Sequence, residues 1–123
     1  EGKTGTYLLY TITRINSIIK KTDSENKNDT VTKLYTDTER ELILSILLTG
    51  DVFRYAIDEK APNYICDNAY RLATVFSKFY HDNHIITETD EEKKKNWIAL
   101  ISLTKRMILK HLDILAIEPV EHM

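Results

Sequence analysis

Apolar residues recur every three or four positions over most of this chain, which is the spacing of one buried face of an α-helix. The first such stretch, from about Thr6 to Lys21, carries an aliphatic stripe at Leu8, Ile12, Ile15 and Ile19. A later stretch, starting at Pro62, carries one at Ile65, Ala69, Leu72, Ala73, Phe76 and Phe79. No segment alternates convincingly between apolar and polar residues, as a half-buried strand would. The pattern predicts an all-α fold.

Local signals divide the first half of the chain into a first, a second and a short third helix. Residues 22–36 are polar and without a period, which predicts a loop. Thr38 and Glu41 have the spacing of a capping box, so a helix is expected to begin near Thr38. The sequence Thr-Gly-Asp at 49–51 predicts the end of that helix, with Asp51 capping a short third one.

Two further helices are expected in the second half. Pro62 is tolerated in the first turn of a helix and indicates where the fourth begins. Residues 81–89 predict a loop, and Thr89 with Glu92 suggests a second capping box at the start of a long last helix. That helix should end before Pro119, which gives a bundle of about five helices.

Composition fits one domain built around a single core. The chain has 123 residues with only three Gly and two Pro, which favours long helices. No apolar run reaches the length of a membrane span, so no membrane association is expected. Cys66 is the single cysteine, which fits a reducing, cytoplasmic environment. Glu1 is not a natural start, so residues 1–123 are expected to be one domain of a longer protein.

Motifs for catalysis are absent from the sequence. The three glycines are scattered, so no phosphate-binding loop is expected. His81 and His84 lie three apart, but no cysteine or second histidine pair completes a zinc site. No nucleophile stands beside a base in the sequence. We therefore expect no catalytic residue, metal site or cofactor in this chain.

Three residues of the first predicted helix suggest a different kind of site. Tyr7, Tyr10 and Arg14 are spaced three and four apart, so they share one helix face, away from the aliphatic stripe. Aromatic rings and guanidinium groups stack on unpaired RNA bases, and Arg also holds phosphate. The alternative is that the tyrosines are half-buried core residues with their hydroxyls at the surface. This stretch alone favours the second interpretation, that of half-buried core residues.

Three longer stretches carry a resemblance to a known family. Residues 4–14 resemble a Gly-x-Tyr-x-Gln-Tyr-x-x-x-Arg motif, and residues 63–81 resemble Tyr-Leu-x-x-Leu-Ala-x-x-Phe-x-x-Phe-Tyr. Residues 109–123 resemble a Leu-Asp-Leu-Leu-Gly-Ile ending that closes on Glu-x-Met. In this order they are similar to the C-terminal anticodon-binding domain of arginyl-tRNA synthetases, which are class I aminoacyl-tRNA synthetases.

The chain departs from that family at several positions. The family's Asp-Ala-Leu-Arg motif falls on residues 102–105, where Ser102 replaces the Asp and Lys105 replaces the Arg. The ion pair that the motif usually makes is therefore in doubt. Leu9 stands at the Gln of the entry motif, and Ala116 stands at the glycine before the final turn.

The resemblance implies a partner and a set of binding residues. The partner is tRNA, whose anticodon loop would pack against this domain. The implied RNA-binding residues are Tyr7, Tyr10, Arg14, Tyr80, His84 and Met123. The resemblance also implies a cytoplasmic, monomeric arginine–tRNA ligase whose separate catalytic domain uses ATP and Mg²⁺. Because the ATP motifs of that domain are missing here, this chain alone should be inactive.

Two alternatives remain at this stage. The net charge of −2 is low for an RNA-binding domain, which favours a helical protein-interaction module of the same fold. The second alternative is the related helical domain of a cysteinyl- or glycyl-tRNA synthetase. The ending at 117–123 favours arginine over these.

Overall fold

The computed structural model describes residues 2–22, 31 and 33–117, and within them every regular element is an α-helix. The helices are α1 (Gly2–Lys21), α2 (Asp37–Asp58), α3 (Pro62–Asp82) and α4 (Glu91–Ile117). The all-α prediction is therefore confirmed, although the described residues form four helices and not five. None of these helices is long and apolar enough to cross a membrane.

The predicted break at 49–51 does not occur, and α2 continues through it. Glycine weakens a helix interior by about 1 kcal/mol, but buried residues on both sides of Gly50 lie on one continuous face. Leu42 and Thr49 precede the glycine on that face, and Ala56 follows it. Asp51 caps nothing; its carboxylate lies 3.3 Å from Arg54 one turn later. Packing against the core outweighs the local signal.

The capping boxes were predicted at the wrong residues. At α2 the N-cap is Thr36, whose hydroxyl accepts a hydrogen bond from the Glu39 amide at 3.2 Å, while the Glu39 carboxylate accepts one from the Thr36 amide. Thr38 is instead buried inside the first turn. At α4 it is Asp90, and not Thr89, whose carboxylate accepts hydrogen bonds from the amides of residues 92 and 93.

Glu39 explains why α2 begins where it does. Its fully buried carboxylate also accepts hydrogen bonds from the Asn96 amide at 3.1 Å and the Trp97 indole at 3.2 Å, both on α4. A buried carboxylate is stable only when such donors surround it. The start of α2 is therefore set by its contact with α4 as well as by local sequence.

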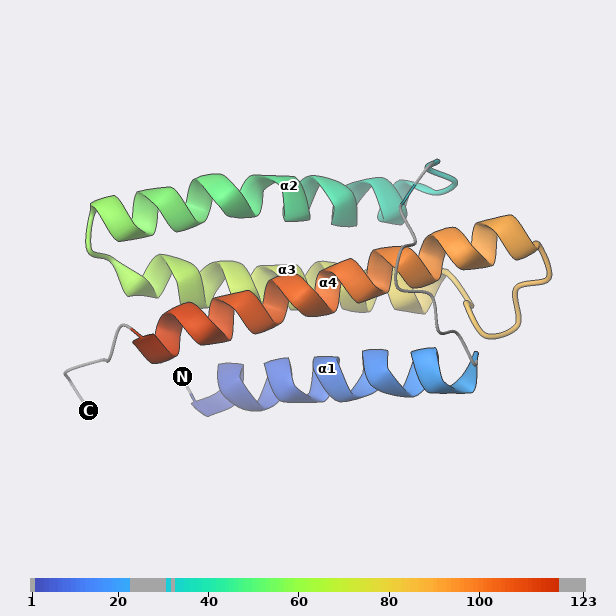
Figure 1. Cartoon of the computed structure of the whole chain (residues 1–123), viewed down its shortest axis with the longest axis horizontal. Coiled ribbons are helices and arrows are strands. Elements are labelled where there is room, and N and C mark those ends of the chain that lie inside the picture. The colour runs from blue at the N-terminus through green and yellow to red at the C-terminus, as the bar shows by residue number, and fades with distance from the viewer. Residues whose placement is uncertain (1, 23–30, 32, 118–123) are drawn as a thin grey trace.

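The helices are arranged so that α1 and α2 lie on opposite sides of the bundle (Figure 1). Each packs against α3 and α4, and within the described residues they share no contact. α1 and α3 run in the same direction, while α2 and α4 run the other way (Figure 1). The parallel pair α1 and α3 brings residues near 7 beside residues near 70, and residues near 14 beside residues near 80.

The core fills the space between the four helices. Its largest buried side chains are Leu8, Ile15, Leu42, Ile65, Leu72, Phe76, Phe79, Ile85, Leu100, Ile101 and Ile108. Phe79 and Trp97 meet edge to face with their centroids 6.0 Å apart, which joins α3 to α4. The aliphatic stripe predicted on α1 is present, with Leu8 and Ile15 fully buried and Ile12 and Ile19 partly buried.

A buried polar cluster lies in the same core. His111 of α4 is fully buried, and its Nδ1 lies 2.6 Å from the Met107 carbonyl, so Nδ1–H donates there. Its Nε2 lies 2.8 Å from the Asn68 amide nitrogen and accepts from it. Both ring nitrogens are therefore satisfied in the neutral form. Burial lowers the pKa of His111, and the nearby Arg71 lowers it further.

Candidate nucleic-acid interface

The polar face of α1 lies along α3. We call the line where the two helices meet the α1–α3 seam. Its aromatic and cationic lining residues are Tyr7, Tyr10, Arg14, Tyr70 and Tyr80. Leu8, Ile15 and the rest of the apolar stripe of α1 point into the core. Tyr7, Tyr10 and Arg14, which are spaced three and four positions apart, therefore lie on the other face of the helix. Tyr10 is the most open of them, with 54% of its surface exposed.

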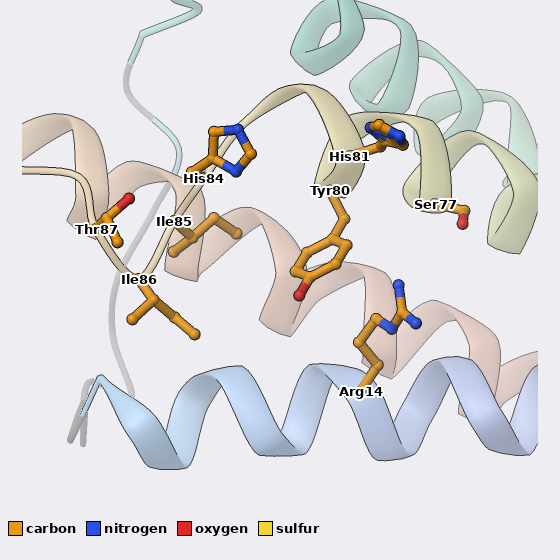
Figure 2. A pocket seen from close by; sticks show the side chains of 8 residues that line it. All are labelled: Arg14, Ser77, Tyr80, His81, His84, Ile85, Ile86 and Thr87. Atoms are coloured by element: carbon orange, nitrogen blue, oxygen red, sulfur yellow. The ribbon is translucent and has the colours of Figure 1, made fainter.

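Arg14 lies between two aromatic rings that come from different helices. The carbon of its guanidinium lies 4.7 Å from the centroid of Tyr10 on α1 and 4.8 Å from the centroid of Tyr80 on α3. One guanidinium nitrogen also donates a hydrogen bond to the Tyr10 hydroxyl. Figure 2 shows Arg14 and Tyr80 pointing toward each other. This arrangement fixes the plane of a cation beside two flat rings.

Tyr80 is fixed in turn by the core. Its ring stacks on buried Phe76, one turn earlier, with the centroids 6.1 Å apart and an interplanar angle of 21°. Phe76 in turn packs against Phe79. Tyr80 is itself only half-buried. One face of the ring is therefore packed in the protein, while the half-buried side chain still lines the pocket described below.

The segment after α3 completes the site by alternating buried and exposed residues. Asn83 is buried and donates from its amide to the Thr38 hydroxyl at 2.8 Å, and Ile85 is fully buried. His84 and Ile86, between and after them, are exposed. Extended backbone at Asn83 sends successive side chains to opposite sides. The two anchors thus hold His84 and Ile86 outward.

Together these elements enclose an open pocket of about 420 Å³ (Figure 2). Its lining residues are Arg14, Ser77, Tyr80, His81, His84, Ile85, Ile86 and Thr87. The cationic guanidinium and the two imidazoles can meet phosphate, while the tyrosine ring and the exposed Ile86 offer apolar surface to a flat base. Three of the predicted binding residues thus meet here: Arg14, Tyr80 and His84, with Tyr10 beside them.

Tyr7 lies farther along the seam, outside this pocket. Its ring is half-buried and packs against Tyr70 of α3, with the centroids 5.2 Å apart. Tyr70 was missed in the sequence. It stands on the polar side of α3, and only the parallel pairing of α1 with α3, which no local pattern encodes, brings it beside Tyr7.

The remaining sequence expectations concern the other end of the chain. Met123 and the ending at 118–123 lie outside the described residues, so its role stays a prediction. At the altered Asp-Ala-Leu-Arg motif, the Lys105 ammonium donates to the Asn16 side-chain oxygen at 2.6 Å. The Lys105 ammonium is therefore hydrogen-bonded to a neutral side-chain amide on α1.

The described residues contain no group of three or more His, Cys, Asp or Glu side chains that could hold a metal ion.

Comparison with known proteins identifies the family of the chain. A family model described as the DALR anticodon binding domain matches residues 8–123. The chain is 42% identical over 125 residues to the arginine–tRNA ligase of Alkaliphilus oremlandii and 36% identical over 128 residues to that of Agathobacter rectalis. The enzyme of the same name from Maricaulis maris is 33% identical over 123 residues.

These matches cover all of this chain but only a small part of each relative. In all three cases the match covers 100% of this chain but 21% of the relative, so the chain spans about a fifth of their length. The family match, which omits only the first seven residues, covers nearly all of the four-helix bundle. The chain therefore belongs to the family of DALR anticodon-binding domains.

Proposed function

We propose that this chain binds the anticodon loop of an arginine tRNA at the α1–α3 seam. The observation that carries the proposal is the position of Arg14, held between Tyr10 and Tyr80 at the edge of an open pocket. Flat rings beside a planar cation are what an unstacked base and its phosphate require. Family membership and similarity to arginine–tRNA ligases support an arginine tRNA as this RNA.

In the proposed complex a loop base leaves its stack and lies against the exposed part of Tyr80 or Tyr10. Arg14 contributes its planar guanidinium, as a second stacking surface or as a bidentate donor to phosphate. His84 reaches the same pocket from the segment after α3. Each stacked base contributes about 1–3 kcal/mol to binding. Met123 is proposed as a further contact from the chain end.

The chemistry of the full enzyme would take place outside this chain. We propose that residues 1–123 form the anticodon-binding part of a longer, monomeric, cytoplasmic arginine–tRNA ligase. Its catalytic domain would bind ATP with Mg²⁺ and transfer arginine to the acceptor end of the tRNA. The role of this chain is to hold the distant anticodon, so it should aminoacylate nothing alone.

The test is binding of anticodon stem-loops to the purified chain. We expect the arginine stem-loop to bind more tightly than cysteine, glycine or unrelated stem-loops, and Tyr80→Ala to weaken binding by about 5- to 150-fold, which corresponds to one stacked base. Tyr55→Ala, an exposed tyrosine on α2, is the matched control and should bind as the unchanged chain does. Equal affinity for all stem-loops would refute recognition of the arginine anticodon.

A protein-interaction module is the second candidate, and one observation favours it. Leu44, Leu47 and Leu48 lie exposed in the middle of α2, the helix on the opposite side of the bundle from α1 (Figure 1). Exposed apolar surface of this kind can mark a protein contact. If Leu47→Glu abolished binding of a protein partner while no stem-loop bound the chain, this candidate would replace RNA recognition.

A further inference from the structure

The α1–α3 seam carries a second aromatic pair, separate from the pocket around Arg14. Tyr7 and Tyr70 meet with their centroids 5.2 Å apart and their planes tilted by 46°. Tyr70 is half-exposed, at 49% of its surface, although its neighbour Ala69 is fully buried. The pair therefore offers a ring surface to the solvent along the same line as the proposed RNA site.

The two aromatic positions are too far apart to serve one base. Tyr70 and Tyr80 are ten residues apart on one helix, which corresponds to about 15 Å along its axis. Bases stacked directly on one another are about 3.4 Å apart along a strand. A loop that reaches both positions must therefore place two splayed bases there, with its backbone running between them.

The surface between the two positions suits a sugar–phosphate backbone. Thr74 and Ser77 are spaced four and three residues after Tyr70 and Thr74, so they continue the same face of α3. Thr74 is exposed and Ser77 lines the pocket. The Thr74 hydroxyl donates to the Tyr70 carbonyl at 2.9 Å, so its oxygen can accept from a 2′-hydroxyl, while the Ser77 hydroxyl can donate to a phosphate; both side chains are short enough to allow close approach.

We propose that Tyr7 and Tyr70 form a second stacking position, which receives another base of the RNA loop bound at Arg14 and Tyr80. This rests on the proposed function and adds Tyr70 to the RNA-contacting residues. The parallel arrangement of α1 and α3 orders the two positions along the loop. The domain then holds the loop at two separated bases, which fixes its orientation as well as its position.

The first experiment compares variants in binding of the arginine anticodon stem-loop. Tyr70→Ala should lower affinity by about 5- to 150-fold, as for loss of one stacked base. Tyr70→Phe keeps the ring and should bind as the unchanged chain does. Tyr64→Ala is the matched control, because Tyr64 is also a half-exposed α3 tyrosine paired with another tyrosine, at 5.1 Å from Tyr55. It should leave affinity unchanged.

The outcomes separate this inference from the function on which it rests. If Tyr80→Ala weakens binding but Tyr70→Ala does not, the second position is refuted and RNA recognition stands. If the unchanged chain binds no stem-loop, both are refuted.

A measurement on the unchanged chain covers the case in which Tyr70→Ala fails to fold. Stem-loops carrying 4-thiouridine in the loop should crosslink to peptides around 70 as well as around 80. Crosslinks around 80 only would overturn the proposal.

Discussion

Arg14 is useful at the residue scale because its side chain is flat. A guanidinium can lie against Tyr10 and Tyr80 together and still present its edge to a phosphate. A lysine ammonium carries the same charge on a flexible stem but has no plane to stack. The position should therefore tolerate Lys for folding and not for recognition.

Arg14→Lys tests this difference. We expect affinity for the arginine stem-loop to fall about 2- to 30-fold, the range of a cation–π contact of about 0.5–2 kcal/mol. Thermal unfolding should change little, because Arg14 is only partly buried and lysine keeps its charge and most of its aliphatic stem. Arg54→Lys, in an exposed ion pair with Asp51 on α2, is the control and should bind RNA normally. Undiminished affinity in Arg14→Lys would mean that charge alone is recognised.

Sequence spacing was enough to group Tyr10 with Arg14, because helical periodicity places residues four apart on one face. It could not show that the Tyr80 ring would lie beside Arg14 or that Tyr7 would contact Tyr70. These contacts depend on which helices pack side by side. His84 came from the resemblance alone, and the anchoring by Asn83 and Ile85 that turns it outward has no local signature.

At the element scale, α2 shows how tertiary packing overrides a local signal. A Thr-Gly-Asp sequence between two apolar stretches indicates a break, yet the helix continues through it. Helix existence was predictable throughout the described chain, since the apolar stripes are long. Helix boundaries were harder to predict from the sequence. The capping box of α2 is formed by Thr36 and Glu39, two residues before the predicted position, because the Glu39 carboxylate also accepts hydrogen bonds from α4.

Gly50→Ala should stabilise the chain. Gly50 lies inside a regular helix without a positive φ, and an added Cβ would meet no atom within 4 Å. The alanine lowers the entropy of the unfolded chain, so we expect a gain of about 0.5–1 kcal/mol in the free energy of unfolding. Urea denaturation measures it. Gly50→Pro is the opposite control and should lose about 3 kcal/mol or more. A destabilising alanine would show that α2 is broken at 50 in solution.

At the scale of the whole molecule, His111 links α4 to α3 in the centre of the bundle. The neutral ring donates to Met107 and accepts from Asn68, so a second ring proton would face the Asn68 amide donor. Since burial lowers the pKa of His111, the unfolded chain takes up this proton first. The stability that the neutral ring provides is complete above the unfolded value of about 6.5 and is lost as pH falls below it.

Chemical denaturation between pH 7.5 and 5 should reveal this loss. The urea midpoint of the unchanged chain should fall as the pH drops below about 6.5, and His111→Gln should remove most of that slope. His81→Gln, on an exposed histidine at the end of α3, should keep it. A slope that survives in His111→Gln would place the responsible group elsewhere.

Net charge sets the expected response of RNA binding to salt. A chain of net charge −2 can neutralise few phosphates, so stacking must provide much of the affinity. We expect log affinity to fall with log salt with a slope of about −1 to −2, at about −0.7 for each phosphate contacted on a single strand. A titration from 50 to 300 mM KCl measures it. A slope of −5 or steeper would contradict the stacking account.

The alternation at residues 83–86 has a consequence for how binding preference can change. Asn83 and Ile85 anchor this segment with their side chains, whereas the side chains of His84 and Ile86 are exposed and the contribution of Ile86 includes its backbone carbonyl, which accepts a hydrogen bond from Lys94 at 3.1 Å. Substitution at these two outward positions should therefore alter which nucleotides are tolerated at little thermodynamic expense. The side chains at 84 and 86 can therefore be replaced, in evolution or by design, without changing the residues that anchor this segment.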